Sequence, residues 1–230
     1  MAIWGEHPQT LSAHHRVVNL EVAGHGQSGT NREDWTMGAF GDDVVAVVGE
    51  LGADEVVLVG FSMGGAVVIE AARRVGDRAL GVVLVDVFHD PDVMMSASEA
   101  EEFQAAIRAN WGSPDFVRAF AFMPDAPDSL IDYVVKQGPE EPYDHLFAAL
   151  DAFQAWGESE FESAVRAMDR PLGAINAAQP STNVEALQAL APSFTVDIVD
   201  GVGHAGILLR HVEDFDALLL GLVDRFASGG

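Results

Sequence analysis

The stretch Val56–Ala72 reads VVLVGFSMGGAVVIEAA, and its three parts indicate the fold of the chain. The first part is a short, continuously apolar run, which is typical of a strand buried on both faces. A serine flanked by glycines follows at Ser62, and residues 65–75 then have the composition of an apolar helix. The stretch therefore predicts a buried strand that turns sharply into a helix, with Ser62 at the turn.

Four more short apolar runs predict strands of the same kind, at 17–22, 81–87, 171–176 and 195–200. Helical patterns separate these runs, at 35–51, 65–75, 183–190 and 214–226. Alternating strands and helices are typical of a parallel sheet with right-handed crossovers. We therefore expect an α/β fold, with a mostly parallel sheet of about five strands flanked by helices.

One segment, residues 88–168, interrupts this alternation and contains no convincing strand. It predicts four helices, which begin at a capping box at Ser98, at Ser113, at Asp128 and at Tyr143. We expect an α/β core formed by 1–87 and 169–230, with 88–168 as a helical cap. The cap holds most of the aromatic residues, which either pack its small helices together or form an apolar lid over a pocket; both interpretations can hold at once.

Composition excludes several classes of function. The net charge of −24 argues against binding to nucleic acid or to an anionic membrane, since both require a positive surface. The absence of cysteine excludes disulfides, thiolate metal sites and a cysteine nucleophile. No apolar run reaches the roughly 18 residues of a membrane span, and the first residues do not resemble a secretory signal. We expect a cytoplasmic protein. The sequence is compatible with a homo-oligomer. The acidic surface is either an ordinary solvated surface or an adaptation to high salt.

The residues Gly60 to Gly64 form a G-x-S-x-G motif around Ser62. A sharp turn between strand and helix holds the serine in a strained backbone conformation with its hydroxyl exposed. Glycine is expected at positions 60 and 64 because strand and helix pass closely there. The amide of Met63, at the N-terminus of the helix, would face an oxyanion that forms at Ser62. The motif indicates a nucleophile, and the alternative is an ordinary tight turn.

Three segments resemble parts of the α/β-hydrolase superfamily: residues 17–29, the motif GFSMGG at 60–65, and VDGVGHAGIL at 199–208. The resemblance extends over most of the chain, which is similar to serine hydrolases that carry a helical cap. The resemblance implies hydrolysis of an acyl compound by a serine, an acid and a histidine, without a cofactor.

The base is expected at His204, which follows the last predicted strand in a glycine-rich loop. A serine hydroxyl becomes a good nucleophile only when a positioned imidazole removes its proton. Among the histidines of the chain, His204 alone combines this loop with a position after the serine. The alternative is a surface or capping histidine.

The acid is harder to assign. The resemblance places it in the loop after 171–176, but residues 177–183 contain no carboxylate. Asp86, at the end of the strand beside the nucleophile strand, is the first candidate, and Asp90 is the second. The alternatives are that Asp86 only binds loop amides or that the acid is absent.

The resemblance also implies a strand ending in His-Gly that supplies a second oxyanion donor. The sequence begins after the place where this strand is expected, so we expect the N-terminal strands and the usual oxyanion loop to be missing. If 17–22 pairs beside 56–61, Gly26 becomes the candidate for the second donor. Otherwise 23–29 is an ordinary loop between a strand and a helix.

These features predict a serine hydrolase that cleaves a small carboxylic ester with an apolar portion, bound by Phe61, Phe120 and Phe147. A cofactor-free perhydrolase would need the same residues. A protein of a different class, a degenerate hydrolase that binds a small apolar ligand or a partner without turnover, is the third possibility. The spacing of His and carboxylate residues argues against a metal site. Residues 24–29 match G-x-G-x-x-G, but no apolar helix follows them, which argues against dinucleotide binding.

Overall fold

The computed structural model describes residues 2–93, 95–138 and 144–229. Its sheet has four parallel strands in the order β1-β2-β3-β4, with bounds Val56–Phe61, Ala79–Val85, Leu172–Ala177 and Thr195–Val199. The expected α/β class with a parallel sheet is confirmed. The described residues contain four strands, where about five were predicted.

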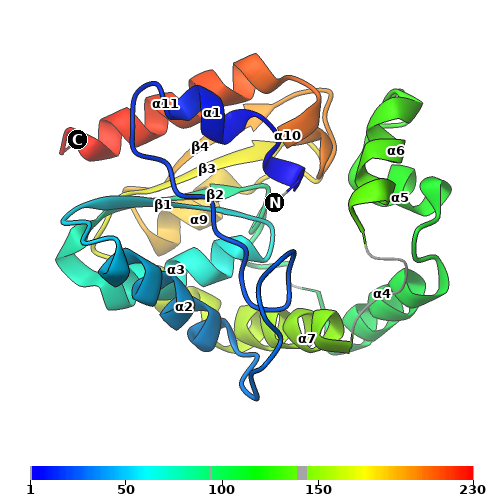
Figure 1. The fold of residues 1–230 in the computed structure, drawn as a ribbon, viewed down its shortest axis with the longest axis horizontal. Helices are drawn as coiled ribbons and strands as arrows, with labels where there is room; N and C mark the ends of the chain where they lie inside the picture. Colours follow the sequence, from blue (N-terminus) through cyan, green and yellow to red (C-terminus); the bar gives the residue numbers. More distant parts are fainter. Residues whose placement is uncertain (1, 94, 139–143, 230) are drawn as a thin grey trace.

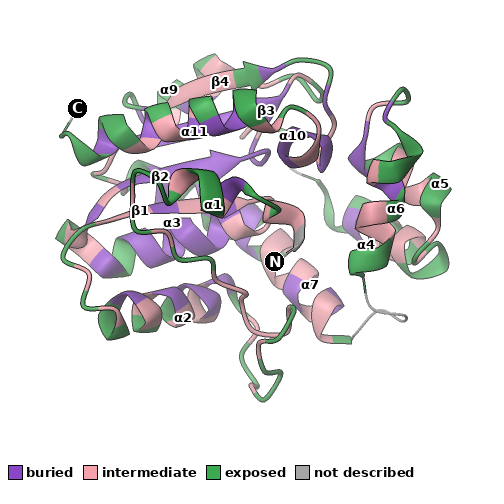
Figure 2. Ribbon diagram, turned by 45° about the horizontal axis from the view of Figure 1, so that its top comes forward, coloured by how far each residue is buried: buried purple, intermediate pink, exposed green. Residues whose placement is uncertain are grey.

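Helices cover both faces of the sheet (Figure 1). On one face lie α2 (Met37–Glu50) and α3 (Gly64–Val75), and on the other lie α1 (His7–Leu11) and α11 (Val212–Ala227). The strands between them are apolar on both sides, and Val82 to Val85 of β2 are completely buried. Figure 2 shows β2 and much of α3 in the colour of buried residues, and β3 is buried over its whole length. This burial on two faces explains why β2 is apolar throughout rather than alternating.

The remaining helices range from three residues in η1 and η2 to 16 residues in α7. They are η1 (Ala2–Trp4), η2 (Gly76–Arg78), α4 (Ala97–Ala109), α5 (Pro114–Ala121), α6 (Asp128–Gln137), α7 (Asp144–Ser159), α8 (Phe161–Arg166), α9 (Val184–Leu190) and α10 (Gly206–Leu209). Five of them, α4 to α8, fall within 88–168, where four were predicted. The start of the fourth predicted helix, Tyr143, lies outside the described residues.

The helices between β2 and β3 pack in two different ways. Side chains of α7 and α8 join the main core, and the indole nitrogen of Trp156 lies 3.0 Å from a carboxylate oxygen of the buried Glu70 on α3. Helices α5 and α6 instead share a small apolar cluster with Ala205 and stand apart from the sheet in Figure 1. The proposed cap boundary at 88–168 remains a prediction.

The helix starts within this segment differ from two of the predictions. The capping box involves Ser96 and Glu99, not Ser98, because α4 begins at Ala97 and the glutamate then occupies the third helical position. Ser113 caps α5 as expected, through the amide of Phe116. Asp128 is the first residue of α6, and Pro127 takes the N-cap position.

The prediction of a buried strand at 17–22 is wrong. These residues form no β-bridge in the structure, and Val18 is 48% exposed. Within the described residues, β1 pairs only with β2 and is therefore an edge strand. A cavity of about 930 Å³ has residues 15–22 and the whole of β1 in its walls. The apolar pattern is present, but the segment has no neighbouring strand with which to form hydrogen bonds.

A buried histidine ties the N-terminal segment to the rest of the fold. His7 is 1% exposed; its Nδ1 lies 2.5 Å from Asp216 Oδ1 and its Nε2 lies 2.6 Å from the Leu208 carbonyl oxygen. Both partners are acceptors, so a ring with a proton on each nitrogen satisfies both contacts. The ring also packs against Phe215, with 4.9 Å between the ring centroids. The contact between His7 and Asp216 thus connects α1 to α11.

The turn from β1 to α3 depends on two glycines. A Cβ atom on Gly60 would lie 2.2 Å from the Gly64 carbonyl oxygen, and one on Gly65 would lie 2.6 Å from Val87 Cγ1. A Cβ on Gly64 would meet nothing within 4 Å. The expectation of crowding is confirmed at position 60 and is wrong at position 64, which faces open space. Gly65 is the second position where the packing requires glycine.

We predict that His7→Ala lowers the free energy of unfolding by about 3–5 kcal/mol, because the buried Asp216 would lose its partner His7. The matched control is His15→Ala, which removes a histidine–aspartate pair whose Asp224 side chain is 57% exposed. That change should cost less than about 1 kcal/mol. Urea denaturation followed by circular dichroism measures both values, and equal losses would contradict the assigned role of His7.

We also predict that Gly60→Ala destabilises the protein by about 2 kcal/mol or more, since the new methyl group would overlap backbone atoms. Gly64→Ala should be neutral or stabilising by up to about 1 kcal/mol, because alanine is the better helix former. Thermal unfolding of the two variants beside the wild type tests this difference. A Gly60→Ala protein as stable as the wild type would show that the turn has room for a methyl group at position 60.

Candidate active site

The register of the sheet brings two of the predicted residues together. Phe61 pairs with Val85 at the ends of β1 and β2, so Ser62 and Asp86 are the next residues on neighbouring strands. Their amides extend the ladder by one step: Ser62 N donates to Val85 O, and Asp86 N donates to Ile175 O, both at 2.9 Å. In open parallel sheets, sites form at this carboxyl edge.

His204 reaches the same edge from the loop that follows β4. The loop is held by α5: the Ala205 amide donates to the Ala121 carbonyl at 2.8 Å. A Cβ on Gly203 would lie 2.7 Å from the Cα of Phe122, so only glycine allows this approach. The contact with α5 therefore directs the imidazole back towards β2.

The imidazole of His204 connects the other two residues. Its Nε2 lies 3.0 Å from Ser62 Oγ, and its Nδ1 lies 2.6 Å from Asp86 Oδ2. The Asp86 side chain is 2% exposed, whereas that of His204 is 25% exposed. A proton on Nδ1 donates to the carboxylate, which leaves Nε2 free to accept the proton of Ser62. This arrangement can activate a serine hydroxyl chemically.

Backbone strain is concentrated in the same place. Among the described residues, three that are not glycine have positive φ: Ser62 at 52°, Asp86 at 49° and Phe88 at 56°. Such conformations each cost of order 1–3 kcal/mol and persist only where the surroundings enforce them. Two of the three residues are in contact with His204, so the strain lies in the candidate site itself.

The environment of Asp86 favours its ionised form. Burial alone would raise the pKa of this carboxyl, but hydrogen bonding to His204 and His89 and the charge of His204 outweigh it. The amide of Ala177 adds a further bond to Oδ1, at 2.7 Å. Together they lower the pKa of Asp86 from the ordinary 3.8 to about 2. Asp86 is therefore a carboxylate at neutral pH.

Asp90, the second candidate for the acid, lies elsewhere. Its carboxylate accepts from Asn183 Nδ2 at 3.1 Å and from the amide of Asp92 at 2.9 Å, so it belongs to a loop network. Sequence reasoning missed His89, whose Nε2 lies 3.3 Å from Asp86 Oδ1. Its spacing of three residues from Asp86 was the only available signal, and it is weak without the structure.

Ser62 opens into the cavity of about 930 Å³. Met63, Phe61, His25 and Gly26 line the same cavity, which continues along the valine and leucine side chains of β1. The ring of Phe61 also stacks on His204, with 4.7 Å between the centroids. The pairing of 17–22 with β1 that would bring Gly26 into the oxyanion role is not found, so its role as a donor remains a prediction.

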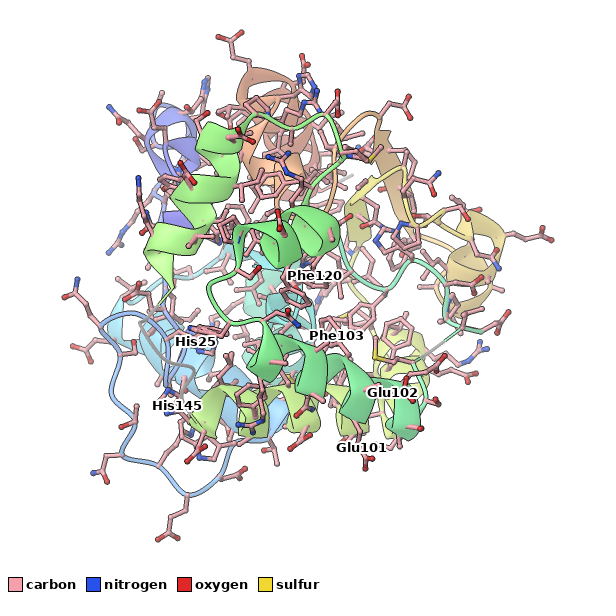
Figure 3. All side chains as sticks on the ribbon, turned by 90° about the vertical axis from the view of Figure 1, so that its right-hand side faces the viewer. His25, Glu101, Glu102, Phe103, Phe120 and His145 are labelled. Atoms are coloured by element: carbon pink, nitrogen blue, oxygen red, sulfur yellow. The ribbon has the colours of Figure 1, made fainter. Side chains whose placement is uncertain are left out.

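The two predicted phenylalanines from the cap lie in different surroundings. Phe120 on α5 is 49% exposed; its centroid lies 5.7 Å from that of His204 and 5.1 Å from that of Phe103 on α4. Figure 3 shows Phe103 and Phe120 together between these helices, with Glu101 and Glu102 further along α4. Phe147 is 2% exposed and does not line the cavity. The centroid of its ring lies 3.3 Å from the guanidinium carbon of Arg108.

Among residues 2–93, 95–138 and 144–229, no group of three or more His, Asp or Glu side chains could hold a metal ion. In the same part of the chain, no helix is long and apolar enough to cross a membrane.

Comparison with known proteins assigns the family. A family model described as the alpha/beta hydrolase family matches residues 2–218. Similar solved structures include a thermophilic esterase from Thermogutta terrifontis (20% identity, TM-score 0.77, 96% of this chain and 84% of that one). A bromoperoxidase from Bacillus anthracis is also similar, with 20% identity, a TM-score of 0.78, and coverage of 96% of this chain and 87% of that one. An esterase from Exiguobacterium antarcticum has 16% identity and a TM-score of 0.80, with coverage of 96% of this chain and 87% of that one.

At these identities the solved structures show the fold alone, and no curated protein matches the sequence. The family model, however, covers almost the whole chain. The chain therefore belongs to the alpha/beta hydrolase family.

Proposed function

We propose that this protein is a carboxylic ester hydrolase that uses Ser62 as nucleophile, His204 as base and Asp86 as acid. The observation that carries the proposal is the continuous contact from Ser62 Oγ through both nitrogens of His204 to Asp86 Oδ2. Esterases among the similar structures support ester hydrolysis as the reaction class.

In the proposed mechanism, Ser62 Oγ attacks the acyl carbon while its proton moves to His204 Nε2. The Met63 amide, at the N-terminus of α3, donates to the oxyanion that develops. The imidazolium, stabilised by Asp86, then protonates the leaving alcohol as the tetrahedral intermediate collapses to an acyl-enzyme. A water molecule activated by His204 Nε2 hydrolyses the acyl-enzyme and releases the acid.

The surroundings of Ser62 favour esters with an apolar portion. The cavity next to Ser62 is lined largely by valine and leucine, and the aromatic rings of Phe61 and Phe120 contact His204. Burying a charged acyl or alcohol group there without a partner would be costly. We therefore propose a substrate that is neutral and partly apolar on the side of β1.

A second candidate is binding of a small apolar ligand without turnover. The large cavity beside β1 favours it, as does the missing pairing of 17–22, which leaves the second oxyanion donor unassigned. Perhydrolysis by the same residues is a further candidate chemistry. The cytoplasmic location and a homo-oligomeric state are proposals that rest on the sequence alone.

We predict that a fluorophosphonate probe labels Ser62 and that Ser62→Ala and His204→Ala each reduce kcat/KM for p-nitrophenyl butyrate by about 10⁴-fold or more. Peptide mass spectrometry locates the label. The matched control is Ser159→Ala, which removes an exposed serine whose hydroxyl donates to the Ala155 carbonyl, and it should retain both labelling and activity. Labelling at another serine, or turnover that survives Ser62→Ala, would contradict the proposal.

We predict that Asp86→Asn lowers kcat by about 10³–10⁴-fold, since an amide no longer fixes the imidazole tautomer or stabilises the imidazolium. The kcat of Asp90→Asn should stay within about threefold of the wild-type value, because the carboxylate of Asp90 accepts hydrogen bonds from Asn183 and Asp92 in the loop network. Steady-state kinetics on the two variants separates the candidates. Equal losses of kcat in the two variants, or a larger loss in Asp90→Asn, would contradict the assignment of Asp86 as the acid.

Asp86 should also contribute to stability in a defined pH range. Its pKa of about 2 in the folded protein lies below the ordinary 3.8, so its contribution is complete above pH ~4 and is lost as the pH falls towards 2. The wild type should therefore lose stability relative to Asp86→Asn as the pH falls from about 4 towards 2, measured by urea denaturation. A difference that does not change with pH would contradict the lowered pKa.

A further inference from the structure

One partly buried imidazole next to the candidate site has no part in the proposed mechanism. His89 lies in the loop after β2, and its side chain is 13% exposed. Its Nε2 lies 3.3 Å from Asp86 Oδ1, and its Nδ1 lies 3.1 Å from the hydroxyl oxygen of Thr182. Asp86 is therefore placed between two histidines, with His204 on Oδ2 and His89 on Oδ1.

The partners of His89 determine its tautomer. A carboxylate can only accept, so Nε2 must carry the proton that faces Asp86. In the neutral ring Nδ1 is then an acceptor, and the Thr182 hydroxyl is the group that can donate to it. That hydroxyl in turn accepts from Asn176 Nδ2 at 3.1 Å, which leaves its own proton free for His89. The three side chains form one directed chain of donors that ends at Asp86.

We propose that His89, oriented by Thr182, is a positioning residue that holds the Asp86 carboxylate so that Oδ2 faces His204. The inference rests on the proposed function, because its consequence for catalysis passes through Asp86 and His204. His89 does not line the cavity that contains Ser62, so it acts on the carboxylate and not on the substrate.

The strained backbone of Asp86, with φ at 49°, does not by itself fix the rotation of the side chain. Its carboxylate can point correctly only while both oxygens are held, since rotation about the side-chain bonds would break the 2.6 Å contact with His204. Oδ1 is fixed by two donors from different segments, the Ala177 amide at the end of β3 and His89 Nε2. Removing one of them should loosen the carboxylate without leaving Oδ1 unpaired.

The loop itself is held by bonds that do not involve the imidazole. The Asn183 amide donates to the His89 carbonyl at 2.7 Å, and Asn183 Nδ2 donates to Asp90. Substitution of the His89 side chain should therefore leave the two loops connected. An effect of such a variant on catalysis can then be separated from unfolding.

The experiment compares His89→Phe, which keeps a ring but no donor, with His89→Gln, which keeps an N–H donor. We expect His89→Phe to lower kcat for p-nitrophenyl butyrate about tenfold, the size expected for a hydrogen bond to a charged group, with KM changed less than about twofold. His89→Gln should recover most of this loss. Asp90→Asn, which alters the same loop without touching Asp86, is the control and should keep the wild-type kcat.

A measurement without turnover tests the tautomer directly. In ¹⁵N-labelled protein, the nitrogen resonances of His89 should show a protonated Nε2 and an unprotonated Nδ1, and Thr182→Val should shift this balance. Unchanged kcat in His89→Phe, equal losses in the Phe and Gln variants, or a protonated Nδ1 with a bare Nε2 would each overturn the proposal. If wild-type activity instead survives Ser62→Ala, the proposed function fails, and the nitrogen resonances still decide the placement of His89.

Discussion

The proposed chemistry of this protein depends on one imidazole that bridges two groups at the ends of neighbouring strands. His204 contacts Ser62 at 3.0 Å and Asp86 at 2.6 Å, and neither contact tolerates a shift of the sheet by one residue. Because Phe61 pairs with Val85, the register of β1 and β2 sets the separation of Ser62 and Asp86. The completely buried valines of β2 hold that register. The packing of the hydrophobic core therefore also sets the geometry of the site.

The position of the proposed acid, Asp86, follows from the same pairing of β1 with β2. The loop after β3, where the family resemblance placed a carboxylate, instead supplies Thr182 and Asn183 to the network around His89 and Asp90. A carboxylate at the end of β2 is closer to the nucleophile strand and lies between β1 and β3. The loop residues then act as support for Asp86, which explains how polar side chains without charge can occupy this place.

Much of this could be predicted from the sequence because strongly apolar runs and a glycine-flanked serine are local signals. The strands at 56–61, 171–176 and 195–200, the turn at Ser62 and the choice of His204 all follow from such signals. The failure at 17–22 has a physical reason: strand formation needs a partner, and the apolar pattern does not show whether one is available. His89 could not be found for a similar reason, since Thr182 joins it from more than ninety residues away in the chain.

The central claim is that Ser62 forms a covalent acyl intermediate. Rapid mixing of the protein with p-nitrophenyl acetate, followed over the first turnover, tests it most directly when the protein is also quenched and its intact mass measured. The account predicts a burst of p-nitrophenol close to one equivalent per chain, together with an added acetyl mass that peptide mapping places on Ser62. Steady turnover with no added mass under conditions where deacylation is slowed, or an acetyl group on another residue, would contradict the account.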